Sequence, residues 1–150
     1  MKTLRSILHL PVLCRGKQAG RVTQVRFSDD LMRMEGIWVD SGLRGTRFIP
    51  VENISRIGSI AVLVDDPGTR RRCTDLPLFR RALTTEGVRI GAIASAEVDE
   101  TTFQVEALEL TKGWLDDLLD SRLRVRRFTA CPSGGAVIIQ APALAPERRE

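Results

Sequence analysis

One 23-residue segment of this chain recurs without a gap 71 positions further along, so that residues 20–42 align with residues 91–113. A glycine stands at each end of both segments, and Glu35 aligns with Glu106. The apolar positions coincide in the pairs Val22 with Ile93, Val25 with Ala96, Phe27 with Val98, Met34 with Val105, Ile37 with Leu108 and Val39 with Leu110. Because a shared hydrophobic pattern between shared glycines specifies the same local fold, the chain is predicted to contain two copies of one small β-unit. A pair of such units is more typical of a platform for partners than of a catalyst.

The alternation of apolar residues slips at the same place in both copies. Val25 and Phe27 lie on one face of a predicted strand, and Val22 is out of phase with them. Ile93 is out of phase in the same way in the second copy. A β-bulge inserts one residue and bends its strand, which explains a slip that both copies share. We therefore expect a bulge in each copy and sheets that curl into small barrels.

Turn-forming residues divide the chain into its predicted parts. The first unit is expected to run a strand into Pro50, then one helical turn, then a hairpin across Gly58. In the second unit about four extra residues follow Gly113, and helical spacing there predicts a short helix that contains Trp114, Leu115, Leu118 and Leu119. The predicted boundaries are 1–66 for the first unit, 67–78 for a polar linker, 79–141 for the second unit and 142–150 for a disordered tail.

The predicted fold class follows from these elements: all-β, with two small barrels in tandem and one short helix in the second. Units of this size bury little apolar surface on their own, so the two copies are expected to pack together. The chain has 150 residues, a formal net charge of +4 and no apolar run of the length that a membrane helix needs. No signal peptide is recognisable, and Cys14, Cys73 and Cys131 are widely spaced. These features favour a cytoplasmic protein with reduced thiols and no membrane insertion.

Residues with catalytic or metal-binding spacing are not evident in the sequence. His9 is the only histidine, and no Gly-x-Ser-x-Gly segment occurs. Asp116, Asp117 and Asp120 have helical spacing, which is typical of a solvated helix face and unlike a calcium loop. We therefore expect no catalytic residue, no cofactor and no metal site.

Several motifs of the first unit together resemble the PRC-barrel domain, known from the photosynthetic reaction-centre H subunit and from a ribosome-maturation factor. They are Leu10-Pro11-Val12, Gly20-Arg21-Val22, Gly36-Ile37-Trp38-Val39, Phe48-Ile49-Pro50-Val51-Glu52-Asn53-Ile54 and Ile57-Gly58. The resemblance covers residues 7–64 well and residues 79–140 less well. It implies a barrel used for binding and assembly, without shared catalytic residues. As an analogy of fold, it does not fix the function.

Two classes of partner remain open from the sequence. The first is a protein, including a second copy of this chain, with Phe79 and Trp114 as candidate interface residues or, alternatively, as parts of an internal core. The second is RNA or the ribosome, because residues 1–75 hold 13 Lys and Arg against 8 Asp and Glu. The candidate nucleic-acid contacts are Arg70, Arg71, Arg72, Arg124 and Arg126. The protein partner is the favoured hypothesis, because exposed aromatic platforms for bases are not apparent in the sequence.

Overall fold

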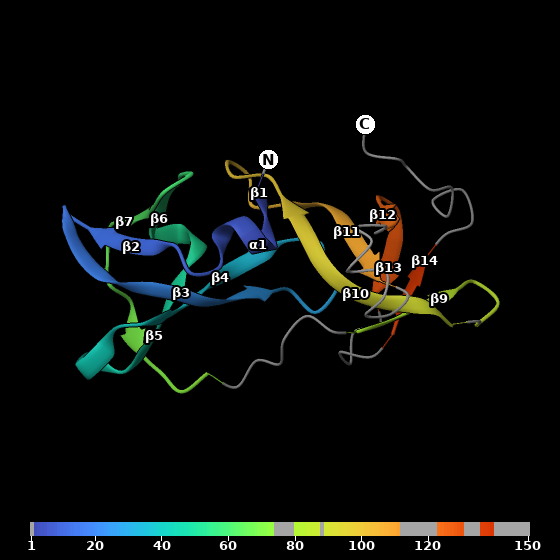
Figure 1. Cartoon of the computed structure of the whole chain (residues 1–150), viewed down its shortest axis with the longest axis horizontal. Helices are drawn as coiled ribbons and strands as arrows, with labels where there is room; N and C mark the ends of the chain where they lie inside the picture. Colours follow the sequence, from blue (N-terminus) through green and yellow to red (C-terminus); the bar gives the residue numbers. More distant parts are fainter. Residues whose placement is uncertain (1, 74–79, 88, 112–122, 131–135, 140–150) are drawn as a thin grey trace.

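The computed structural model describes residues 2–73, 80–87, 89–111, 123–130 and 136–139, and over these residues the chain is built mainly of β-strands (Figure 1). The described strands form two seven-stranded sheets, each drawn mainly from one half of the chain. The predicted all-β class with barrel-like sheets is thereby confirmed.

The first sheet has the strand order β6-β7-β2-β3-β4-β5-β8. Its members are β2 (Pro11–Cys14), β3 (Lys17–Phe27), β4 (Met34–Asp40), β5 (Thr46–Pro50), β6 (Ile54–Ile57), β7 (Val62–Val64) and β8 (Thr69–Arg70). Two 3₁₀ turns, η1 (Gly42–Arg44) and η2 (Val51–Asn53), connect strands. The predicted helical turn after Pro50 and the hairpin across Gly58 are both confirmed.

The second sheet has the order β12-β11-β10-β9-β14-β13, and β1 pairs with β10 beside this path. Its members are β1 (Lys2–Thr3), β9 (Arg81–Thr84), β10 (Arg89–Val98), β11 (Val105–Thr111), β12 (Leu123–Val125), β13 (Phe128–Ala130) and β14 (Val137–Ile139). Read in reverse, β13-β14-β9-β10-β11-β12 repeats the connectivity of β6-β7-β2-β3-β4-β5. The first and last hairpins of each unit are joined by a parallel strand pair, which is β2 with β7 in the first sheet and β9 with β14 in the second.

The helix α1 (Leu4–Ile7) has no counterpart among the sequence-based predictions. Thr3 caps it, because its side chain accepts a hydrogen bond from the Ser6 N–H at 3.2 Å, and Ile7 is fully buried. Four residues are too few to produce a helical period in the sequence. The helix predicted around Trp114 lies outside the described residues.

The register of the central hairpin is the same in both copies. All six residue pairs of β3 with β4, from Arg21–Asp40 to Phe27–Met34, recur 71 positions later between β10 and β11. The register shift between Val22 and Gln24 recurs between Ile93 and Ser95. The bulges expected from the shared phase slip are therefore confirmed.

The two copies meet around equivalent backbone groups. Arg33 and Gln104, which correspond in the repeat, form an isolated antiparallel bridge. The Met34 N–H donates to the Phe103 carbonyl at 2.8 Å, and the counterpart bond runs from the Val105 N–H to the Met32 carbonyl at 2.8 Å. These paired bonds relate the copies by an approximate two-fold axis.

Each copy contributes to the hydrophobic core of the other. Val98 of β10 belongs to the core cluster of the first sheet, and Leu31 of the β3–β4 turn belongs to that of the second. Phe27 and Val105 pack against both clusters. The units therefore pack together, as their small size led us to expect.

The segment predicted as a linker contributes to the first sheet. Thr69 and Arg70 form β8, which pairs with Phe48 and Arg47 of β5. The pairing adds an edge strand beside β5. It also brings Arg71 against the side of the sheet on which the rings of Trp38 and Phe48 lie. Residues 74–78 of the predicted linker are outside the described part of the chain.

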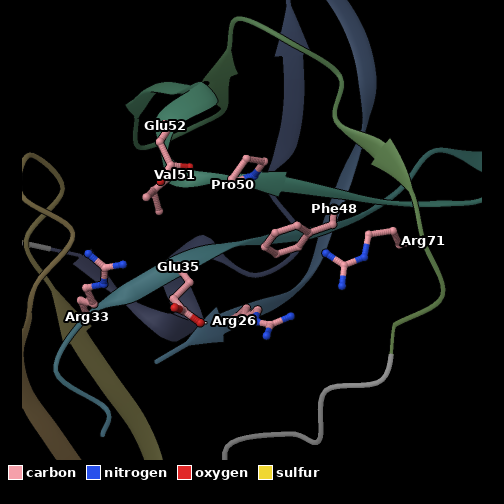
Figure 2. Close-up of a pocket in the computed structure, with 8 residues that line it drawn as sticks. All are labelled: Arg26, Arg33, Glu35, Phe48, Pro50, Val51, Glu52 and Arg71. Atoms are coloured by element: carbon pink, nitrogen blue, oxygen red, sulfur yellow. Dashed lines mark hydrogen bonds and ion pairs between the residues drawn. The ribbon is translucent and has the colours of Figure 1, made fainter. Parts of the chain in front are cut away.

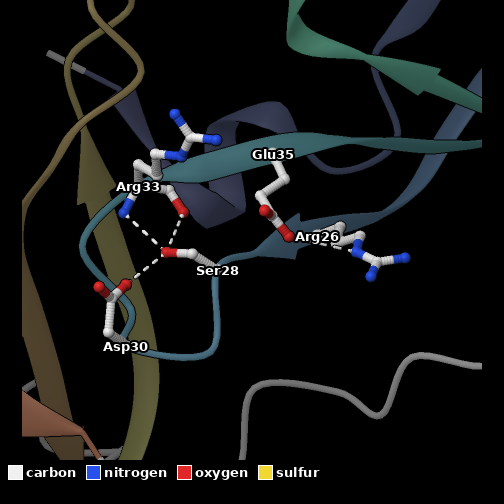
Figure 3. Close-up of polar contacts among 5 residues, drawn as sticks. All are labelled: Arg26, Ser28, Asp30, Arg33 and Glu35. Atoms are coloured by element: carbon white, nitrogen blue, oxygen red, sulfur yellow. Dashed lines mark hydrogen bonds and ion pairs between the residues drawn. The ribbon is translucent and has the colours of Figure 1, made fainter. Parts of the chain in front are cut away.

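Aspartates organise the turns at the junction of the two copies, and Figure 3 shows the first of them. Asp30 accepts hydrogen bonds from the Ser28 hydroxyl at 2.7 Å and the Met32 N–H at 3.0 Å. Asp99 accepts from the backbone N–H groups of Thr101 and Thr102 at 2.7 and 3.0 Å. These bonds lower the pKa of both carboxyl groups. The bond from the Ser28 hydroxyl has the largest effect on Asp30, and the bond from the Thr102 N–H has the largest effect on Asp99.

This lowering gives a pH dependence of stability. Because the folded pKa lies below the ordinary value of 3.8, the stabilisation is complete above that value and is lost as the pH falls through the lowered pKa. The free energy of unfolding should therefore decline below about pH 4. The Asp99→Asn variant should show a smaller difference between urea unfolding midpoints at pH 7 and pH 3 than the wild type, whereas an unchanged difference would contradict the assignment.

Candidate binding surface

Alternation along β4 places its aromatic residue on the side opposite the core. Ile37 and Val39 belong to the first core cluster, and Trp38 between them belongs to neither cluster although its exposed fraction is 0%. Other groups on the outer side of the sheet must therefore cover Trp38.

Phe48 of β5 is one of these covering groups. Trp38 and Phe48 are cross-strand partners, with ring centroids 4.8 Å apart and planes inclined at 49°. The Phe48 ring also extends over Gly36, where a Cβ atom would lie 2.5 Å from Phe48 Cζ. Glycine at position 36 is thus what allows the ring to lie flat against the sheet. Phe48 remains half-buried rather than fully covered.

Two guanidinium groups flank the Phe48 ring. The Cζ atom of Arg71 is 5.2 Å from the Phe48 centroid and 5.5 Å from the Trp38 centroid. The Cζ atom of Arg26 is 5.7 Å from the Phe48 centroid. All three distances lie in the range of cation–π contacts. We call Arg26, Trp38, Phe48 and Arg71 the arginine–aromatic surface.

Backbone contacts fix Arg71 beside the rings. Its N–H donates to the Thr46 carbonyl at 3.1 Å. The Arg47 guanidinium donates to the carbonyls of Pro67 and Gly68 at 3.0 and 2.6 Å, which holds the start of β8 against β5. Gly68 has φ +80°, and a Cβ atom there would lie 2.2 Å from the Phe48 carbonyl oxygen. The close approach of β8 to β5 therefore depends on this glycine.

A small pocket opens beside Phe48, with a volume of about 280 Å³ (Figure 2). Arg26 and Glu35 form an ion pair at 3.4 Å on its lower side, and Arg33 lies at the end opposite Arg71. The lining residues are Arg26, Arg33, Glu35, Phe48, Pro50, Val51, Glu52 and Arg71. The lining holds three arginines and two glutamates, so its net charge is positive. Because Arg26 and Glu35 pair with each other, Arg33, Arg71 and Glu52 are the remaining charged groups of the lining.

The equivalent positions of the second sheet have different chemistry. By strand pairing, Glu109 takes the place of Trp38 and Arg124 that of Phe48. The Arg124 Nε donates to Glu97 Oε2 at 2.9 Å, and the two side chains are only 20% and 10% exposed. An internal ion pair therefore occupies the second copy at the place where the first copy presents its aromatic rings.

The five arginines proposed as nucleic-acid contacts do not form one group. Arg70, Arg71 and Arg72 are exposed at the β8 end of the first sheet. Arg124 lies in the second sheet, paired with Glu97, and Arg126 follows it and is exposed. Phe79 and Trp114, the candidate interface residues, lie outside the described residues.

The sequence analysis does not single out Trp38, Phe48 or Arg26, because most aromatic residues of the chain stand at core-like positions of the predicted strands. Strand alternation carries the missing signal. With Ile37 and Val39 facing the core, Trp38 between them must face the opposite side of the sheet. Phe48, which pairs with Trp38 across the strands, must face that side as well.

Among the described residues, no group of three or more His, Cys, Asp or Glu side chains is placed to hold a metal ion. The helices in that part of the chain are all too short or too polar to cross a bilayer. No protein-family model and no curated protein sequence matches the chain. The PRC-barrel resemblance therefore stays a prediction.

Proposed function

We propose that this chain is a non-catalytic, cytoplasmic binding and assembly module that docks a protein partner on the arginine–aromatic surface. One observation carries this proposal: the half-buried Phe48 ring lies on the outer side of the sheet between the Arg26 and Arg71 guanidinium groups. Aromatic residues and arginine are enriched in the centres of protein interfaces and account for much of their binding energy. The resemblance to the PRC-barrel domain supports the same class of function by analogy.

The test is quantitative capture of partners from a nuclease-treated native lysate by the immobilised full chain. The Arg71→Glu variant should reduce recovery of a specific partner at least about tenfold, because it replaces the central cation by an anion. The exposed Arg89 at the start of β10 in the second sheet provides the matched control Arg89→Glu, which should retain recovery within about twofold. Equal recovery by the two variants, or no specific partner at all, would contradict the proposal.

Self-association is a special case of the same proposal. If the partner is a second copy docked at this surface, light scattering should give the mass of a dimer for the wild type and of a monomer for Arg71→Glu. A dimer that persists in the variant would place the contact between copies elsewhere.

RNA binding is the second candidate, favoured by three consecutive exposed arginines, Arg70 to Arg72, next to Phe48. Arginines that contact phosphates make affinity fall steeply as ionic strength rises. Replacing these three arginines by alanine should then flatten the salt dependence of RNA binding. Absence of RNA binding at low salt would remove this candidate.

A further inference from the structure

Arg71 is held in place by groups that leave its hydrogen-bond donors unused. The rings of Trp38 and Phe48 attract the guanidinium charge through their faces, and the backbone N–H of Arg71 is fixed by Thr46. An arginine side chain has five N–H donors. Among the described residues none accepts a hydrogen bond from the Arg71 side chain, and no acid forms an ion pair with it. An oriented guanidinium with free donors is suited to a planar anion, which it binds through two parallel hydrogen bonds.

The charges around Arg71 favour an anion as well. Its neighbours in sequence, Arg70 and Arg72, are both exposed arginines. Of the two acids in the pocket, Glu35 is engaged by Arg26 at 3.4 Å. An incoming anion would therefore meet a positive electrostatic potential from the arginines, which the negative charge of Glu52 offsets only in part.

The lining of the pocket bears on the kind of anion that it suits. Its volume of about 280 Å³ falls just below the range of about 300–1,000 Å³ that is typical of small-molecule sites. Pro50 and Val51 give it an apolar wall close to the charged groups, as Figure 2 shows. An apolar wall beside a cation suits an acidic side chain, whose methylene groups would contact the wall while its carboxylate meets Arg71. A nucleotide requires a broader stacking surface in addition to a phosphate site.

We infer that the docked partner presents an acidic segment, and that Arg71 receives one of its glutamate or aspartate carboxylates in a bidentate pair. This inference rests on the proposed function and names the chemistry of the partner at the same surface.

The experiment is calorimetric titration of the full chain at low ionic strength with three capped probes: hexaglutamate, hexaglutamine and a hexauridine RNA. Hexaglutamate should bind, and hexaglutamine should not. Arg71→Gln should weaken hexaglutamate binding at least about tenfold, because glutamine removes both the charge and the pair of donors that would hold the carboxylate. The control Arg89→Gln should remain within about twofold of the wild type.

Arg71→Lys provides a second variant in case the glutamine substitution impairs folding. Lysine keeps the charge and the cation–π contact but loses the planar fork, so hexaglutamate affinity should fall severalfold. In the wild type, the indole N–H resonance of Trp38 should shift as hexaglutamate is added, because Arg71 lies over that ring.

Three results would overturn the inference: no hexaglutamate binding, binding that Arg71→Gln and Arg71→Lys leave unchanged, or tighter Arg71-dependent binding of hexauridine than of hexaglutamate. If hexaglutamate fails while partner capture still depends on Arg71, the docking surface stands and only the acidic chemistry of the partner is wrong. If capture also becomes independent of Arg71, the proposed function fails as well.

Discussion

Gly20→Ala should lower the free energy of unfolding by about 3–5 kcal/mol, a loss in the range reached by a strained backbone combined with a clash in a packed sheet. Gly20 has φ +148°, and a Cβ atom there would lie 2.3 Å from the Asp40 carbonyl oxygen and 2.6 Å from Val39 Cγ1. The clash involves backbone, which can move aside only if β3 and β4 separate. Gly20 also pairs with Val12 next to a register shift between β2 and β3.

Gly42→Ala is the matched control for this substitution. Gly42 has φ +64°, and no atom lies within 4 Å of the place that a Cβ atom would occupy, so alanine there meets conformational strain alone. That strain costs about 1–2 kcal/mol. Urea unfolding of both variants measures the difference. Equal losses for Gly20→Ala and Gly42→Ala would show that the close approach at β3 and β4 contributes nothing to stability.

Leu31→Ala should lower the free energy of unfolding by about 2–5 kcal/mol, and its effect should reach the second sheet. Leu31 is 3% exposed and packs in the core of the second sheet, although the residue belongs to the first copy of the repeat. Amide hydrogen exchange should therefore show reduced protection in β10 and β11. Truncation of a core leucine removes its apolar contacts and leaves a cavity in that core.

The adjacent Met32 serves as control, since its side chain is 47% exposed. Met32→Ala should change stability by no more than about 0.5 kcal/mol. Loss of protection confined to the first sheet in Leu31→Ala, or equal losses of stability in the two variants, would contradict the exchange of core residues between the copies.

The repeat and its bulges could be predicted from the sequence, because both depend on the order of apolar residues within short segments. The spacing from Val22 to Val25 and Phe27 breaks a period of two, and only an inserted residue restores it. The same break occurs at Ile93, and the register shifts of the two copies lie at those places. Turn residues such as Pro50 and Gly58 likewise specify their conformations locally.

The exchange between the copies could not be predicted, because it depends on contacts far apart in the chain. Nothing local to Leu31 indicates that it packs in the second core, nor that Lys2 and Thr3 pair with Val98 and Glu97 of β10. The cover over the outer side of the first sheet could not be predicted for a related reason. Phe48 and Trp38 are covered on the outer side of the sheet by Arg71. Arg71 belongs to the segment that the sequence predicts as a linker.

The most direct test of the docking surface is amide hydrogen exchange of the full chain with and without the captured partner. Binding should protect residues 46–50 of β5 and the residues of β8, and should leave the equivalent strand β12 of the second sheet unchanged. Protection that appears on β12 while β5 and β8 exchange as in the free protein would contradict the assignment of partner binding to the arginine–aromatic surface.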